Sequence, residues 1–133
     1  MRINITSVMV DNQEKALKFY TEKLGFKKMA DIPMGEYRWL TVRAAEGPGG
    51  IELALEPMGF PEARDFQKAL YAAGTPFTAF RTDDIDKEYQ QLKNRGVIFR
   101  GEPQVMGPIK SVLFDDTCGN LINLVQPLVL PED

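Results

Sequence analysis

The sequence predicts an α+β fold in which the same order of elements, β-α-β-β-β, occurs twice. Two observations lead to this prediction. Strand-like segments precede each of two segments whose apolar residues recur at helical spacing. Each helical segment also starts at an acidic residue, Asp11 in the first half and Asp83 or Asp84 in the second, and it ends at a glycine, Gly25 or Gly96. We therefore expect an internal repeat.

The first half begins with a strand at residues 2–10, which are rich in β-branched types and contain no breaker. Apolar residues then recur at helical spacing, which predicts an amphipathic helix over 12–24. Asp11 and Glu14 resemble a capping box at its start. Three further strands are expected at about 26–31, 37–43 and 51–56.

The second half repeats this order. A strand at 77–82 leads into a helix that ends at Gly96, and the last strands are expected near 97–100, 109–115 and 120–126. Between the halves, Pro61 at a first helical position predicts a short connecting helix at about 60–73. We therefore expect a single domain over 1–133, with module one at about 2–56 and module two at about 76–126.

The composition excludes several classes of protein. The chain has 133 residues, 44% hydrophobic and 26% charged, which suits a soluble domain with one core. Its net charge of −3 without a Lys/Arg cluster argues against a nucleic-acid partner. No run approaches the roughly 18 apolar residues of a membrane span, so no membrane partner is expected. The single cysteine, Cys118, excludes an internal disulfide and fits a reducing cytoplasm.

The chain contains no histidine, which removes Ser-His-Asp and Cys-His catalysis and every His-ligated metal site. Acid–base chemistry would have to use Glu, Asp, Lys, Tyr or Cys118. The carboxylates of Asp115 and Asp116 would raise the pKa of the Cys118 thiol. We therefore interpret Cys118 as a turn residue without a chemical role.

Two motifs carry a resemblance to a known family. The first helix leads to Phe19-Tyr20 and then to Leu24-Gly25-Phe26, and the turn at 114–120 combines Phe, Asp, Gly and Asn at fixed spacing. Both motifs, in this order, resemble the vicinal oxygen chelate superfamily of glyoxalases, bleomycin-resistance proteins and extradiol dioxygenases. In the closing turn, Thr117 stands where the family has proline, and Cys118 replaces its second aspartate.

The resemblance implies that two βαβββ modules pair into a half-open, eight-stranded barrel around a cleft. Metal-dependent members hold a divalent ion with four side chains, and those positions fall here on Ile5, Glu52, Phe77 and Asn123. Two hydrocarbon side chains, one amide and one carboxylate make a poor site for Zn²⁺, Ni²⁺ or Fe²⁺. We therefore expect a member that lacks the usual metal-ligand set and has no cofactor. A divalent metal held in part by Glu52 is the alternative.

Strand alternation then predicts which side chains line the cleft. Successive side chains of a strand point to opposite faces. If Ile5 and Glu52 point into the cleft, every second residue along their strands points into it as well. The result is an apolar and aromatic cavity with a few polar groups, as is typical of small-molecule sites. The expected lining residues are Ile5, Met9, Tyr37, Trp39, Glu52, Glu56, Phe77, Arg81 and Asn123.

Several of these residues allow two interpretations. Trp39 could stack a flat or cationic ligand, or it could be an ordinary core aromatic. Glu52 could be a general base, or its carboxylate could pair with Arg38 or Arg81. Glu56 is expected to be solvated at the rim, and Arg81 could clamp an anionic ligand or lie on the surface.

The leading functional hypothesis is a protein that binds a small apolar or aromatic molecule in the cleft between the modules, without a metal. The alternative is a lyase, isomerase or dioxygenase-type enzyme with Glu52 as its catalytic base or partial metal ligand. A third hypothesis is an interaction module whose pocket is filled by side chains. By analogy with the family, a homodimer is expected.

Overall fold

The computed structural model describes residues 1–47 and 49–128, and it confirms the repeated order of elements. The first half contains β1 (Ile5–Val10), α1 (Gln13–Lys18), the π-helical turn η1 (Phe19–Lys23), β2 (Lys27–Met34), β3 (Tyr37–Arg43) and β4 (Glu52–Pro57). Helix α2 (Pro61–Ala72) connects the halves. The second half contains β5 (Thr78–Arg81), α3 (Ile85–Asn94), β6 (Ile98–Met106), β7 (Ile109–Asp115) and β8 (Leu121–Pro127).

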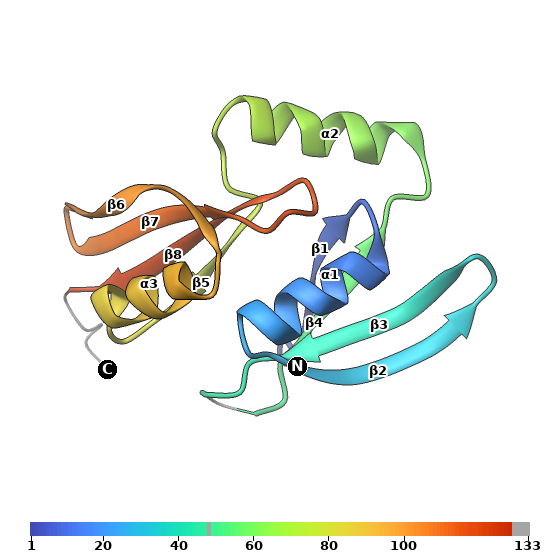
Figure 1. Ribbon diagram of the computed structural model, residues 1–133. Coiled ribbons are helices and arrows are strands. Elements are labelled where there is room, and N and C mark those ends of the chain that lie inside the picture. The colour runs from blue at the N-terminus through green and yellow to red at the C-terminus, as the bar shows by residue number, and fades with distance from the viewer. Residues whose placement is uncertain (48, 129–133) are drawn as a thin grey trace.

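The two halves form two four-stranded sheets with the same topology. Their strand orders are β1-β4-β3-β2 and β5-β8-β7-β6, with β1 parallel to β4 and β5 parallel to β8. Figure 1 shows α1 and α3 lying against their own sheets, with α2 at one end of the molecule. Within the described residues no strand pairing joins the two sheets, so the expected barrel is half-open.

The start of the first helix differs from the prediction. The side chain of Asn12 accepts a hydrogen bond from the Lys15 backbone N–H at 2.9 Å, so Asn12 is the cap. Asp11 instead pairs with the Lys15 ammonium at 2.9 Å. In the second half the cap is Asp84, one of the two predicted candidates.

The predicted helix over 12–24 is α-helical only to residue 18 and continues as the π-helical turn η1. The wider turn brings the neighbouring side chains of Phe19 and Tyr20 into the core, where both are buried. The helical segment stops before Gly25, whose φ of +76° suits glycine.

Two strands are longer than the sequence pattern indicated. Strand β2 continues to Met34, beyond the expected 26–31, and β6 continues to Met106, beyond the expected 97–100. Both strands contain a proline, Pro33 in β2 and Pro103 in β6. Because β2 and β6 are edge strands, a missing backbone donor is tolerated there. Figure 1 shows that β2 and β3 form a long hairpin extending from the first sheet.

One hydrophobic core is shared by the two halves. Aromatic rings of η1 reach the second sheet: Phe19 lies 6.3 Å from Phe114 and Tyr20 lies 6.4 Å from Phe80, measured between ring centroids. The core side of the first sheet faces α1 and buries Val8, Val10, Leu40, Val42, Leu53 and Leu55. The opposite faces of the sheets are therefore turned away from this core.

A buried polar network fastens the halves together. The carboxylate of Asp116 accepts hydrogen bonds from the Tyr20 hydroxyl at 2.7 Å, from the Asn120 side chain at 2.8 Å and from two backbone N–H groups of the closing turn. Asn120 also donates to the Met9 carbonyl at 2.7 Å. The two motifs that resemble the family thus meet in this network.

Helix α2 closes the same end of the molecule. Its buried Gln67 donates to the Met9 carbonyl at 2.9 Å and lies 3.1 Å from the Asn120 side-chain oxygen. A Cβ on Gly119, whose φ is +98°, would come within 3 Å of the Gln67 amide, so this turn requires glycine. Among the described helices, none has the length and apolar character needed to cross a membrane.

Candidate functional site

The candidate site is the face of the first sheet that points away from α1. Ile5 pairs with Glu52, and Met9 pairs with Glu56, in the parallel register of β1 and β4. Tyr37 and Trp39 occupy the same face of β3, because the alternate residues Leu40 and Val42 are buried toward α1. The structure thus brings the predicted residues of module one together on one sheet face.

Aromatic and aliphatic side chains of this face are accessible to solvent. Trp39 is 37% exposed, Tyr37 41% and Ile5 40%, so Trp39 is not a closed core aromatic in this chain. The neighbouring hairpin strand adds Ile32 at 55% and Met34 at 61%, which pair with Trp39 and Tyr37. Exposed apolar surface of this kind is typical of interaction sites, which makes this face a candidate.

Strands β3 and β4 separate within this face. The strands pair at Val42–Leu53 and Thr41–Ala54, and beyond Thr41 the Gln13 side chain takes the place of the strand-to-strand hydrogen bonds. Its amide donates to the Arg38 carbonyl at 2.7 Å and to the Leu55 carbonyl at 2.9 Å, and its oxygen accepts from the Arg38 N–H at 3.0 Å. Gln13, the first residue of α1, therefore holds the strands apart and satisfies their backbone groups.

The carboxylate of Glu52 is held by a hydroxyl group. The Oγ1 of the buried Thr41 donates to Glu52 Oε1 at 2.6 Å and accepts from the Ala30 N–H at 3.1 Å, beside a bulge in β2. The alternative that Glu52 pairs with Arg38 or Arg81 is wrong for this structure.

Both arginines have other partners. Arg38 binds both oxygens of Asp31, at 2.9 and 2.7 Å, and contacts Glu14 of α1 at 2.6 Å. These carboxylates raise the pKa of Arg38, so it remains a cation. Arg81 lies 3.3 Å from Asp83 on the exposed surface. Arg38 projects to the α1 side of the sheet, because Trp39 beside it projects to the other side.

The predicted residues of module two lie on the second sheet. Arg81 pairs with Val125, and Asn123 pairs with Ala79, in the parallel register of β5 and β8. Phe77, just before β5, contacts Phe66 of α2 with ring centroids 6.2 Å apart. The structure therefore divides the predicted lining residues between two sheets.

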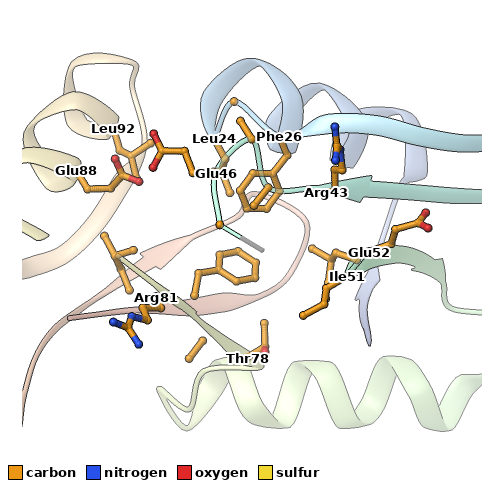
Figure 2. Close-up of a pocket in the computed structure, with 18 of the residues that line it drawn as sticks. Leu24, Phe26, Arg43, Glu46, Ile51, Glu52, Thr78, Arg81, Glu88 and Leu92 are labelled. Atoms are coloured by element: carbon orange, nitrogen blue, oxygen red, sulfur yellow. The ribbon is translucent and has the colours of Figure 1, made fainter. Parts of the chain in front are cut away.

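A cavity of about 650 Å³ is lined by residues of both modules. Two of its lining residues, Phe26 and Phe80, meet edge to face with ring centroids 5.5 Å apart. Figure 2 shows Phe26 among the side chains that line the cavity. Of the predicted side chains only Glu52 and Arg81 line it, and in Figure 2 the Glu52 carboxylate points away from its middle. A cleft between the modules was expected from the sequence, but most of its lining differs from the predicted set, because the lining depends on how the modules pack.

The donor set does not fit a divalent metal. Of the family's four metal positions, Ile5 and Glu52 are direct strand partners, so one carboxylate faces a hydrocarbon side chain. Within residues 1–47 and 49–128 no three or more Cys, Asp or Glu side chains gather as possible ligands. The Glu52 carboxylate is moreover already bonded by Thr41.

The environment of Cys118 agrees with its interpretation as a turn residue. Burial, together with the charges of Asp116 and Asp11, raises the pKa of its thiol to about 12. The side chain is fully buried in the closing turn. A thiol that stays protonated is a poor nucleophile.

Sequence reasoning missed four side chains at or beside this face. Ile32 and Met34 were missed because β2 was expected to end near residue 31. Gln13 was missed because a glutamine at the start of a helix carries no pattern that distinguishes it from a solvated residue. Arg43, at the end of β3, was also missed; its Nε is buried and forms no hydrogen bond within the described part of the chain.

Comparison with known proteins shows similarity over almost the whole chain. The protein YurT of Bacillus subtilis (strain 168) is 50% identical over 126 residues, which cover 95% of this chain and 99% of YurT. The crystal structure of UcmS2 has a TM-score of 0.80 at 30% identity and covers 94% of this chain and 97% of that one. TnmS3, described as an antibiotic binding protein from Streptomyces sp. CB03234, has a TM-score of 0.75 at 33% identity, with 96% of each chain covered.

The family model for the Glyoxalase/Bleomycin resistance protein/Dioxygenase superfamily matches residues 2–124. The match includes both motifs, every predicted site residue and all strands except the last three residues of β8. The repeated βαβββ topology and the solved relatives agree with it. This chain therefore belongs to the Glyoxalase/Bleomycin resistance protein/Dioxygenase superfamily.

Proposed function

We propose that this protein binds a small apolar or aromatic molecule on the exposed face of its first sheet, without a metal ion. The observation that carries the proposal is the gathering of Tyr37, Trp39 and Ile5 on one accessible face beside the Glu52 and Glu56 carboxylates. Small-molecule sites combine such aromatic surface with a few polar groups that fix orientation.

The relatives support this class of function. TnmS3, which shares 33% of its residues with this chain, is described as binding an antibiotic. Antibiotics are small organic molecules, and a binding protein needs a surface that receives one rather than a set of reacting groups. The superfamily also includes enzymes. An enzyme with Glu52 as its base is therefore the alternative function, and the Glu52→Gln variant distinguishes it from binding alone.

We also propose that the site is completed by a second copy of the chain. The predicted residues Arg81 and Asn123 lie on the second sheet, Phe77 directly precedes its strand β5, and the first sheet face keeps Trp39, Tyr37 and Ile5 exposed. On the second sheet, Ile98 and Met106 of β6 are also more than 60% exposed. A homodimer that sets the first sheet of one copy against the second sheet of the other would cover both faces.

A cytoplasmic location remains part of the proposal, because Cys118 has no second cysteine in the sequence to pair with.

A thermal-shift panel of aromatic compounds and divalent metals tests the proposed function. We expect a subset of aromatic compounds to stabilise the protein; a compound at 100 times its Kd should add about 2.7 kcal/mol. Divalent ions and a chelator should leave the melting temperature unchanged. The variant Trp39→Ala should lose the stabilisation, while Phe60→Ala, which removes an exposed aromatic outside this face, should keep it.

Two results would count against the proposal. The first is a metal-induced stabilisation that chelator reverses, which would favour a partial metal site at Glu52. The second is stabilisation by a compound that is consumed by the wild type but not by Glu52→Gln, which would favour an enzyme.

A further inference from the structure

The two carboxylates of the first sheet face are not equivalent. Glu52 accepts a hydrogen bond from Thr41, and the register that pairs Val42 with Leu53 places Arg43 opposite Glu52 on the next step. Glu56 has no side-chain hydrogen bond or ion pair with any residue in the described ranges. Its acceptor oxygens are therefore free to bind a group that the chain itself does not provide.

Glu56 lies across a gap from the only tryptophan. The paired register of β3 and β4 ends at Thr41–Ala54, and two residues further along the strands lie Trp39 on β3 and Glu56 on β4. The strands are held apart there by the Gln13 amide, which bonds to Arg38 and Leu55. The gap thus has an indole on one side and a half-buried carboxylate on the other.

Among the described residues of one chain, no Lys or Arg side chain forms an ion pair with Glu56. Arg38, beside Trp39 in sequence, projects to the α1 side and is bound by Asp31 and Glu14. Arg43 shares the face but lies opposite Glu52, four residues along β4, which is about 13 Å of strand. The Trp39 half of the face is therefore negative and aromatic.

These features select a charge type for the ligand. The face of an indole ring attracts a cation through its quadrupole, and a carboxylate binds a protonated amine by a charge-assisted hydrogen bond. We infer that the molecule bound at this site is a planar aromatic that carries a protonated amine, with its ring on Trp39 and its ammonium group on Glu56. This inference rests on the proposed function and names the class of its ligand.

The test compares three anthracenes that differ only in the group on carbon 9: aminomethyl, hydroxymethyl and carboxylate. Quenching of Trp39 fluorescence reports binding of each at low salt and pH 7. We expect the amine to bind at least about fivefold more tightly than the alcohol, and the acid to bind most weakly. The preference for the amine should shrink as salt rises.

Charge-removing variants locate the effect. Glu56→Gln should weaken amine binding about fivefold and leave alcohol binding unchanged, because only the ion pair is lost. Glu62→Gln, on exposed α2, makes the same change in net charge away from the face and should alter neither affinity. Thermal melting of each variant verifies that it is folded.

Three outcomes separate the inference from the proposed function. Equal binding of amine and alcohol, with Glu56→Gln unchanged, would overturn the inference and leave the proposed function standing. Preferential binding of the acid would overturn it in favour of an arginine anchor. If no anthracene quenches Trp39 and none shifts the melting temperature, the inference and its premise both fail.

Discussion

Tyr20 and Asp116 lie 96 positions apart in the sequence, and their side chains meet at 2.7 Å inside the molecule. Burial, together with the Asp116 charge, raises the pKa of Tyr20 well above its usual value, so the hydroxyl remains a donor. Burial also raises the pKa of Asp116, while the hydrogen bonds from Asn120 and Tyr20 lower it. At the residue scale, the hydrogen bond between Tyr20 and Asp116 joins the end of the first helical segment to the closing turn.

Tyr20→Phe should lower the free energy of unfolding by about 2 kcal/mol, because a buried hydrogen bond to a carboxylate is lost. Urea unfolding at pH 7 measures this. Tyr89→Phe is the control, since the Tyr89 hydroxyl makes no hydrogen bond within the described residues, and it should change stability by less than about 0.5 kcal/mol. Equal effects of the two substitutions would contradict the account of the network.

Asp116 also gives stability a pH dependence with a definite sign. Its pKa is higher in the folded than in the unfolded chain, so the folded state binds more protons between the two values. Its contribution to stability is therefore present below about pH 4 and is lost as the pH rises through the folded pKa. Tyr20→Phe removes a hydrogen bond that lowers the pKa of Asp116, so this pKa should be higher in the variant. The stability that Asp116 contributes should therefore be lost over a range that reaches higher pH. Unfolding free energies between pH 4 and 8 test this order.

Cys118 should resist thiol reagents in the folded protein. With the thiol pKa raised to about 12, its thiolate fraction at pH 8 is roughly a thousandfold below that of a free cysteine. Labelling with a chromogenic disulfide should therefore be at least that much slower in buffer than in denaturant. Labelling at the rate of a free thiol would show that the closing turn is open in solution.

At the scale of single elements, the N-terminus of α1 determines the shape of the sheet face. The Gln13 side chain enters the gap between β3 and β4 and bonds to both strands. The same gap separates Trp39 from Glu56. A helix on one side of the sheet thus sets the spacing of side chains on the other.

Gln13→Ala should cost about 1–3 kcal/mol of stability, because partly buried backbone groups of Arg38 and Leu55 lose their partners. It should also weaken binding on the Trp39 face, since the strands can close. Gln90→Ala is the matched control: within the described part of the chain, the Gln90 side chain bonds only to Asn94, on the exposed surface of α3. Denaturant unfolding and a fluorescence titration of both variants check this. If Gln13→Ala is destabilised but binds as tightly as the wild type, the gap between β3 and β4 is not needed for binding.

At the scale of the whole molecule, sequence patterns predicted the repeat and the faces but not how the faces meet. Strand alternation correctly placed Trp39 with Ile5 and Glu52, because the period of a strand is local. Whether one chain encloses a cleft depends on side chains that cross between modules, such as Phe19 against Phe114. No local pattern contains that information. The predicted lengths of β2 and β6 were too short, because both strands continue through a proline, Pro33 or Pro103. These prolines are tolerated because both strands lie at sheet edges, a position that only the tertiary structure determines.

The proposed dimer makes a prediction at the same scale. Met34→Glu places a charge on the exposed first sheet face and should shift the protein from dimer to monomer in sedimentation experiments, since a buried unpaired charge is costly. The control is Met1→Glu, made in a chain with one additional methionine in front for translation, which places the same charge at the exposed N-terminal end. A wild type that sediments as a monomer at high concentration while it binds aromatic compounds would contradict this arrangement.

The most direct test of the proposed binding site is a nuclear magnetic resonance titration of the labelled protein with 9-(aminomethyl)anthracene in metal-free buffer. The account predicts saturable shifts of the Trp39 indole N–H and of backbone amides in β1, β3 and β4, with no need for added metal. Shifts confined to the residues around Phe26 and Phe80, or shifts that appear only after a divalent ion is added, would contradict it.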